Sequence, residues 1–337
     1  GYIIKTKRIA FNPYLKILLI IFIWCSITYI VADDTNAAKA ELIRIWGVYL
    51  YCHVFSAVSH NSKCRNILFC CYVIIFINCC IYAYENILSL SGDILLDNNQ
   101  RLGDEKLNAN VFGYFLIFLT FIVFSAENNT DILWVKRITR IIFLLIIPLS
   151  FILAILTASR QILILEIPFI SLLLAKRYIS SLNFKSVFII LALCISAAYL
   201  YSEYGIGLYE NSYLKTRSEV SVGDDPRMGL LNDALNVGFE NPVFGVGPGN
   251  FRYHTPENVF SHNSFAELFA NNGILPALLF AFLLCKFSLE KFNNWIKKRS
   301  SLNYSLLIVS IFYIIDNFFY VMYLSTWLMG FFFVLTN

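Results

Sequence analysis

Long apolar segments divide this sequence into blocks, and their length constrains the fold more than any other feature. A helix needs about 20 apolar residues to cross ~30 Å of hydrocarbon. The segments that approach this length are Tyr14–Val31, Glu41–Val58, Asn66–Leu88, Ala109–Ala126, Arg140–Thr157, Gln161–Ala175, Ser186–Tyr201, Ser264–Cys285, Ser301–Asp316 and Asn317–Leu335. Only 14% of the residues are charged, against about a quarter in a soluble domain. We therefore predict an all-α polytopic membrane protein with about 10 transmembrane helices.

Basic residues gather in alternate loops, and this sets the expected orientation. Lys5, Lys7 and Arg8 precede the first segment, and further Lys and Arg clusters follow the second, fourth, sixth and eighth segments. Because such clusters mark cytoplasmic loops, the other loops are expected to be external. The net charge of +4 is thus a signal of topology and gives no indication of nucleic-acid binding.

This topology divides the chain into four regions. We expect N-terminal transmembrane helices in residues 1–139 and further transmembrane helices with the Arg160 hairpin in residues 140–201. A large external loop that contains short helices follows in residues 202–263, and C-terminal transmembrane helices complete the chain in residues 264–337. External loops of this length are usually functional.

The large loop contains a helical pattern and a tight turn. Apolar spacing from Arg227 to Leu235 predicts a short helix. Three glycines and two prolines in Pro242–Phe251 predict a turn that shapes the edge of a pocket. A dinucleotide loop is disfavoured, because it needs a preceding strand. Gly247 and Gly249 would also allow backbone N–H groups to approach phosphate oxygens.

A few polar residues stand at the ends of apolar segments, where their cost makes them functional candidates. Arg160 lies in a hairpin on the external side, with an arginine that snorkels to the lipid interface as the alternative. His262 and Asn263 stand where the large loop enters the next segment. Glu267 follows on the same helix and is expected to hold His262 or a substrate hydroxyl, with a structural ion pair as the equal alternative.

Two further acids are expected to have different surroundings. Glu166 should face the interior of the helix bundle, and Asp316 should lie at a helix end on the external surface. The sequence has no HExxH or other metal-ligand spacing, so we expect a site without metal or cofactor.

External arginines beside one histidine suit a particular chemistry. Arginine binds phosphate through two parallel hydrogen bonds and stays charged. Histidine titrates near neutral pH and can take a proton from a hydroxyl group. Arg160 and Arg227, with the loop residue Arg217 as a further candidate, would bind a lipid diphosphate, and His262 would activate an acceptor hydroxyl for glycosyl transfer.

Three motifs, in order, resemble the O-antigen ligase/polymerase superfamily of bacterial envelope proteins. Leu156–Arg160 resembles the Thr/Ser-x-x-Arg hairpin of that superfamily. Asp225–Leu235 resembles its loop helix that opens with Arg, although the aromatic residue common in that motif is here a leucine. Pro242–Phe251, Ser261–Glu267 and Asn272–Ile274 resemble its terminal block of glycines, His-Asn, Glu and Gly-Ile. Residues 1–140 match nothing beyond membrane segments.

The resemblance implies a metal-independent membrane glycosyltransferase of the GT-C type in the bacterial inner membrane, with its active site facing the periplasm. It implies catalytic roles for Arg160, Arg227 and His262. The implied partners are an undecaprenyl-pyrophosphate-linked oligosaccharide, an acceptor glycan, membrane lipids and a chain-length regulator protein.

Three functions compete. A polymerase adds a glycan to another lipid-linked repeat unit, whereas an O-antigen ligase transfers the glycan to lipid A-core. Ser261–Phe265 and Asn272–Ile274 look more like polymerase members, so we favour the polymerase. A transporter of lipid-linked glycan is disfavoured, because internal repeats and matched broken segments are not seen.

Overall fold

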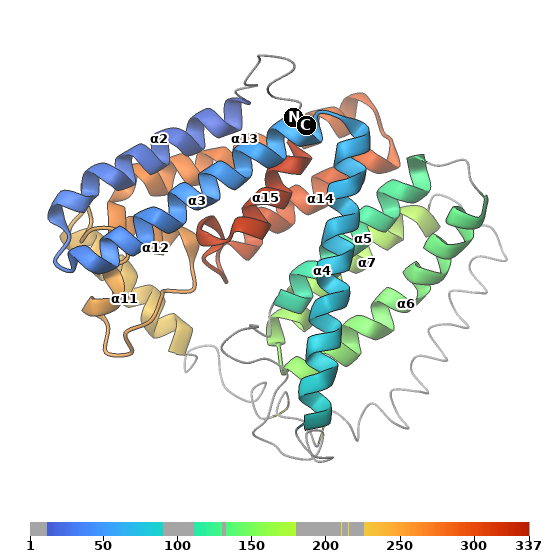
Figure 1. Ribbon diagram of the computed structural model, residues 1–337, viewed down its shortest axis with the longest axis horizontal. Coiled ribbons are helices and arrows are strands. Elements are labelled where there is room, and N and C mark those ends of the chain that lie inside the picture. The colour runs from blue at the N-terminus through green and yellow to red at the C-terminus, as the bar shows by residue number, and fades with distance from the viewer. Residues whose placement is uncertain are drawn as a thin grey trace. The chain divides into compact units, whose positions relative to one another are not determined.

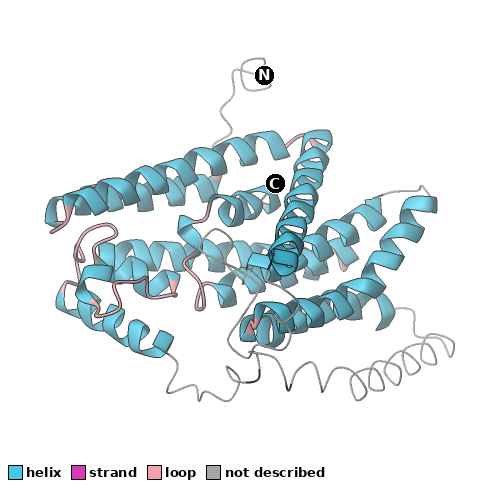
Figure 2. Cartoon of the chain, turned by 60° about the horizontal axis from the view of Figure 1, so that its bottom comes forward, coloured by secondary structure: helices cyan, strands magenta, loops and turns pink. Residues whose placement is uncertain are grey.

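The computed structural model describes residues 12–89, 111–129, 133–179, 210, 215 and 226–336. Their regular structure is helical, and none of these residues forms a strand (Figure 2). The predicted all-α class is confirmed for this part of the chain. Three described helical segments are long and apolar enough to cross a membrane, namely Pro13–Val31, Thr35–Ser59 and Ser62–Tyr82. The count of about 10 stays a prediction, and Ser186–Tyr201 lies outside the described residues.

The chain divides into two compact units. Unit 1 comprises Gly1–Leu68, Val222–Asn293 and Ser310–Asn337, and unit 2 comprises Phe69–Ser221 and Asn294–Val309. Unit 1 therefore joins the N-terminal helices to residues that follow more than 150 positions later, so that Pro242–Phe251 and His262 belong to the same unit as those helices.

Unit 1 begins with a helical hairpin whose two helices lie side by side (Figure 1). Helix α2 (Pro13–Ile27) starts at a proline, and the Asn12 side chain accepts a hydrogen bond from the N–H of Tyr14. Proline at the first helical position costs no hydrogen bond, because that N–H would have no partner in the helix. After the short η1 (Thr28–Val31), Asp34 caps helix α3 (Thr35–Ser59).

Aromatic side chains fill the core of unit 1. Phe332 on α15 (Thr326–Leu335) lies 4.7 Å, between ring centroids, from Phe287 on α13 (Ile274–Lys297). It lies 5.2 Å from Tyr313 on α14 (Ser301–Asp316), and Tyr14 meets Phe287 edge to face. These rings are fully buried, and α15 also packs along α3 (Figure 1). The N-terminal helices are therefore integral to the unit that contains His262.

Two predicted segments are interrupted. The prediction of one helix over Ser264–Cys285 is wrong, because α12 (Ser264–Asn272) ends at Gly273 and α13 then begins. Gly273 has a φ of 84°, and Pro276 lacks the N–H that a continuous helix would donate to the carbonyl of Asn272. The Trp24 indole donates to that carbonyl instead, at 2.9 Å.

The last predicted segment, Asn317–Leu335, is also wrong as a single helix. A turn follows α14, then the short η5 (Met322–Leu324), and α15 begins only after Ser325, whose side chain caps it. The Asn317 side chain donates to the carbonyl of Tyr313 and so competes with the helical hydrogen bonds at this point.

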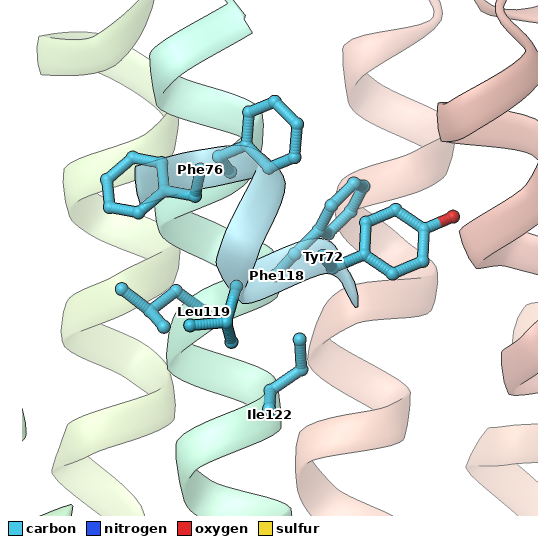
Figure 3. Close-up of a pocket in the computed structure, with 7 residues that line it drawn as sticks. Tyr72, Phe76, Phe118, Leu119 and Ile122 are labelled. Atoms are coloured by element: carbon cyan, nitrogen blue, oxygen red, sulfur yellow. The ribbon is translucent and has the colours of Figure 1, made fainter. Parts of the chain in front are cut away.

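Unit 2 is built on three helices that contact one another, α5 (Val111–Asn129), α6 (Leu133–Thr157) and α7 (Ile167–Ile179). Gly113 on α5 lets Glu166 approach, because a Cβ at Gly113 would lie 2.8 Å from Glu166 Oε1. Helix α4 (Ser62–Ser89) begins in unit 1 and continues into unit 2. There Tyr72 and Phe76 of α4 line an apolar groove with residues of α5 (Figure 3).

A methyl group at Gly273 should destabilise unit 1. The Cβ of Gly273→Ala would lie 2.0 Å from the carbonyl oxygen of Val243, and alanine disfavours a positive φ. We expect a loss of about 2 kcal/mol or more, seen as a lower apparent Tm of the purified protein. Gly47→Ala on α3 is the matched control, since nothing lies within 4 Å of its added Cβ. Equal Tm values for the two variants would contradict this account of the break.

Candidate functional site

The backbone of His262 is strained. Its φ of 56° places it in the left-handed region, which residues other than glycine rarely adopt. His262 is half-buried and directly precedes Asn263, the cap of α12. Strained residues persist only where the surrounding structure fixes them, and they concentrate at functional sites. The predicted position of His262 at the mouth of a helix is confirmed.

Glu267 fixes the turn that carries His262. Its Oε2 accepts a hydrogen bond from the N–H of Ser261 at 2.7 Å, and its Oε1 accepts one from Nδ2 of Asn271 at 2.9 Å. The side chain is only 1% exposed. Both oxygens thus accept from protein donors, and the predicted contact of Glu267 with His262 or a substrate hydroxyl stays a prediction. Asn263 caps α12 by accepting from the N–H groups of Phe265 and Ala266, at 2.9 and 3.0 Å.

Ser264 joins this turn to the turn after α14. Its N–H donates to the carbonyl of Asn317 and its hydroxyl to that of Tyr320, both at 2.8 Å. The N–H of Met322 donates to the same hydroxyl at 2.8 Å. The prediction that Asp316 lies on the external surface is wrong, because the turn folds back onto Ser264 and leaves Asp316 0% exposed at the end of α14.

The glycine turn packs against the end of α12. The N–H groups of Val246 and Gly247 donate to the carbonyls of Ala270 and Asn271, at 2.9 and 2.8 Å. The amide of Gly247 is therefore already used and does not face a phosphate. Gly245 must be glycine, because its φ is 63° and an added Cβ would lie 2.4 Å from the Asn271 carbonyl carbon.

Gly247 and Gly249 leave room for the N-terminal hairpin. A Cβ added to Gly247 would lie 2.6 Å from Ala32, and a Cβ added to Gly249 would lie 3.1 Å from the Cβ of Glu41. The buried side chain of Asn250, which follows Gly249, accepts a hydrogen bond from the N–H of Asp34 at 2.7 Å and donates one to the carbonyl of Asp34 at 3.3 Å. The predicted substrate-binding role of Gly247 and Gly249 remains a prediction, whereas close packing accounts for both residues.

Asp34, whose backbone binds the side chain of Asn250, has a charged side chain. Its carboxylate accepts from the N–H of Ala37, which is the main reason that its pKa lies below the usual range. Tyr253 and Arg252 lower the pKa further. Because the pKa is lowered, Asp34 is ionised at neutral pH and keeps its role as the cap of α3.

Arg227 stands in the first turn of the predicted short helix, which is confirmed as α11 (Pro226–Glu240). Gly238 of α11 contacts Phe269 near the C-terminal ends of α11 and α12, and Ala234 and Ala266 continue the same apolar cluster. Arg227 and His262 both precede this contact, since Arg227 lies in the first turn of α11 and His262 lies just before α12. Their predicted catalytic roles remain predictions.

Arg160 occupies the predicted hairpin in unit 2. Helix α6 ends at Thr157, and Ala158 takes a φ of 47°. The N–H of Ser159 donates to the carbonyl of Ala154 and that of Ala158 to Ile155, which is a Schellman cap without glycine. Helical structure resumes at the half-buried Arg160 and passes through the π-helical η2 (Ile162–Glu166).

The remaining predicted residues are placed as follows. Glu166 faces the interior of unit 2 as predicted, since it is fully buried against Gly113. Arg217 lies outside the described residues. Arg227, His262 and Glu267 all belong to unit 1, while Arg160 belongs to unit 2. In the described part of the chain, no three His, Cys, Asp or Glu residues are grouped to hold a metal ion.

Sequence reasoning missed Glu41 and Arg252. Glu41 is a buried carboxyl of α3 beneath Gly249, and Arg252 lies in η4 (Phe251–His254), just after the glycine turn. Glu41 did give a signal in the sequence, because an acid within an otherwise apolar helix is costly. Arg252 gave no signal, since an arginine in an external loop is ordinary.

A comparison with protein families identifies part of the chain. A family profile described as O-Antigen ligase matches residues 142–281. The resemblance to the O-antigen ligase/polymerase superfamily is confirmed. The matched region begins within α6, ends within α13 and contains Arg160, Arg227 and His262. No curated protein matches the chain. The match covers fewer than half of the residues, and α2, α3, α14 and α15 lie outside it.

The strain at His262 predicts an unusual order of stability. Glycine adopts a φ of 56° without the cost that a Cβ imposes, so His262→Gly should be more stable than His262→Ala by about 1 kcal/mol. The order at an ordinary helical position is the reverse. Apparent Tm values of the two purified variants measure the difference. A more stable alanine variant would show that His262 does not hold this conformation.

Proposed function

We propose that this protein is a surface-polysaccharide polymerase, a membrane glycosyltransferase that extends an O-antigen chain. The superfamily is that of O-antigen ligases and polymerases, which act on lipid-linked glycans. The observation that carries the proposal is the strained His262 turn, held by Glu267 within the matched region. A histidine fixed this way is suited to take a proton from a sugar hydroxyl.

The proposed reaction uses this chain's own residues. The acceptor hydroxyl oxygen attacks the anomeric carbon of the donor glycan while its proton passes to His262. The bond from that carbon to the diphosphate breaks, and undecaprenyl diphosphate leaves. Arg160 and Arg227 stabilise the negative charge that develops on the leaving diphosphate. In this proposal the protein works at the periplasmic face of the inner membrane without a metal ion.

A ligase is the second candidate function. It would use the same residues but transfer the finished glycan to lipid A-core. We favour the polymerase because Ser261–Phe265 and Asn272–Ile274 look more like polymerase members of the superfamily. A polymerase would also have a chain-length regulator protein as a partner.

Deletion of the gene separates the two candidates. Surface polysaccharide from the deletion strain, resolved on a gel, should show lipid A-core capped by single repeat units. This result is expected because capping continues when only polymerisation is lost. Bare core with polymer left on the carrier lipid would instead identify a ligase. An unchanged gel pattern would contradict both functions.

The variants of His262 should separate chemistry from binding. We expect that His262→Ala and His262→Gly both lose glycosyl transfer but keep the affinity for the lipid-linked donor, since the proposed base does not grip the diphosphate. Product formation by the purified protein and binding of labelled donor measure the two effects. Activity retained in either variant would exclude His262 as the base.

Replacement of Arg160 by lysine tests the proposed grip on diphosphate. Arg160→Lys keeps the charge but loses the planar fork that forms two parallel hydrogen bonds. We expect activity to fall by about 10- to 100-fold, which corresponds to about 1.5–3 kcal/mol. Arg137→Lys on the exposed surface of α6 is the matched control and should keep full activity. Equal activities of the two variants would show that Arg160 does not grip the donor.

A further inference from the structure

Of the buried polar atoms in unit 1 that have no hydrogen-bond partner in the described part of the chain, three belong to Glu41 or to residues that interact with it electrostatically. They are Oε1 of Glu41, Nε of Arg252 and the hydroxyl of Tyr323. Glu41 is 9% exposed and Tyr323 is 2% exposed, while Arg252 is half-buried. One atom accepts a hydrogen bond, one donates, and the hydroxyl does either.

Glu41 and Arg252 adjoin the glycine turn, and Tyr323 directly follows Met322, whose N–H donates to the hydroxyl of Ser264. Glu41 lies beneath Gly249, and Arg252 follows that glycine by three residues. Glu41 interacts electrostatically with Arg252 and with Glu267, and Tyr323 interacts with both carboxylates. Glu267 in turn holds the N–H of Ser261, next to His262.

A short hydrogen-bond chain links Arg252 to the same turn. The N–H of Phe251, its neighbour, donates to Oδ1 of Asn271 at 2.8 Å. The same Asn271 side chain donates to Glu267 at 2.9 Å. The position of Arg252 is therefore coupled to the position of the proposed base through two side chains.

The absence of partners is costly for these groups. A buried polar group that lacks a hydrogen bond destabilises a protein. Oε1 of Glu41 and Nε of Arg252 both lack a partner in the described part of the chain. Each such group in a folded protein needs an explanation, and a third group that connects the two side chains would supply one.

The charges around the site determine which group fits. An anion would meet the carboxylates of Asp34, Glu41 and Glu267, all of which interact with Arg252. A cation would meet Arg252 and Arg44. A neutral group that both donates and accepts avoids these repulsions, and a hydroxyl does so through a single atom.

Tyr253 adds a feature suited to sugars. Its ring is 48% exposed, and the Arg252 guanidinium lies 5.1 Å from the ring centroid. The exposed ring gives an apolar face beside polar groups that are aimed at hydroxyls. A bound pyranose presents the same combination of a C–H face and hydroxyl edges.

We propose that Glu41 and Arg252, backed by Tyr323, bind a hydroxyl of the acceptor sugar beside His262. The inference rests on the proposed glycosyl transfer and assigns its acceptor subsite. Glu41 lies in α3, outside the matched residues 142–281, so the N-terminal hairpin would supply part of the site. A hydroxyl would donate to Oε1 of Glu41 and accept from Nε of Arg252.

Steady-state kinetics of the purified full chain test the proposal. The acceptor is the repeat-unit oligosaccharide of the producing cells, carried on an octyl group without diphosphate, and the donor is the undecaprenyl-diphosphate-linked repeat unit at saturation. Glu41→Gln and Arg252→Gln should raise the acceptor KM by about 10- to 100-fold, the effect of losing a hydrogen bond to a charged group. The donor KM, measured in a second series with the donor varied and the acceptor at saturation, should change by less than about twofold, well below that effect.

The matched control is Lys39→Gln, which removes an exposed charge from the same helix and should leave both KM values unchanged. An unchanged acceptor KM in Glu41→Gln and Arg252→Gln, with a lower Tm, would mean that only a structural water joins these groups and would overturn the inference. A wild-type protein that transfers no glycan would overturn the proposed function itself.

A measurement on the wild-type protein tests the proposal even if the variants fail to fold. Hydrogen–deuterium exchange should slow in residues 250–254 and in the first turns of α3 when the octyl acceptor is added. Protection is expected because the bound hydroxyl would connect Glu41 to Arg252. Unchanged exchange at saturating acceptor would overturn the proposal independently of any substitution.

Discussion

The contact between the glycine turn and the end of α12 is the interaction on which unit 1 depends. The N–H groups of Val246 and Gly247 donate to carbonyls that a longer helix would have used internally. The same turn receives Glu41 from α3 and binds Asp34 through Asn250. One turn of backbone thus joins the N-terminal hairpin to the helix that follows His262, and a side chain at Gly245 would push it away from α12.

The break at Gly273 makes this contact. Had Ser264–Cys285 formed one helix, the carbonyls of Ala270 and Asn271 would have accepted helical hydrogen bonds, whereas Pro276 has no N–H to donate to the carbonyl of Asn272. Because α12 stops there, the carbonyls of Ala270 and Asn271 accept from the glycine turn, and that of Asn272 accepts from Trp24. The short α12 therefore holds its neighbours at its C-terminal end and presents His262 at its N-terminal end.

Much of this arrangement could be predicted from the sequence, for reasons that differ between residues. The helix that begins near Arg227 and the Arg160 hairpin follow from local apolar spacing and a short polar stretch, so their patterns sufficed. The breaks at Gly273 and Asn317 did not show in hydropathy, since apolar residues continue on both sides. The partnership of Glu41 with Gly249 joins residues about 200 positions apart, and no local pattern reports it. Arg217 was predicted from its residue type and loop position alone, and its role remains a prediction.

The scarcity of charge gives the buried acids of unit 1 their meaning. A membrane helix that needs only to be stable would have an apolar residue in place of Glu41, because an unused carboxyl oxygen in a buried site lowers stability. Both carboxyl oxygens of Glu267 accept hydrogen bonds, one from the N–H of Ser261 and one from the side chain of Asn271, whereas Oε1 of Glu41 accepts none in the described part of the chain. Two carboxyls of one unit thus differ in a way that packing alone does not explain. The difference is explained if Glu267 shapes the site and Glu41 awaits a group that arrives with the substrate.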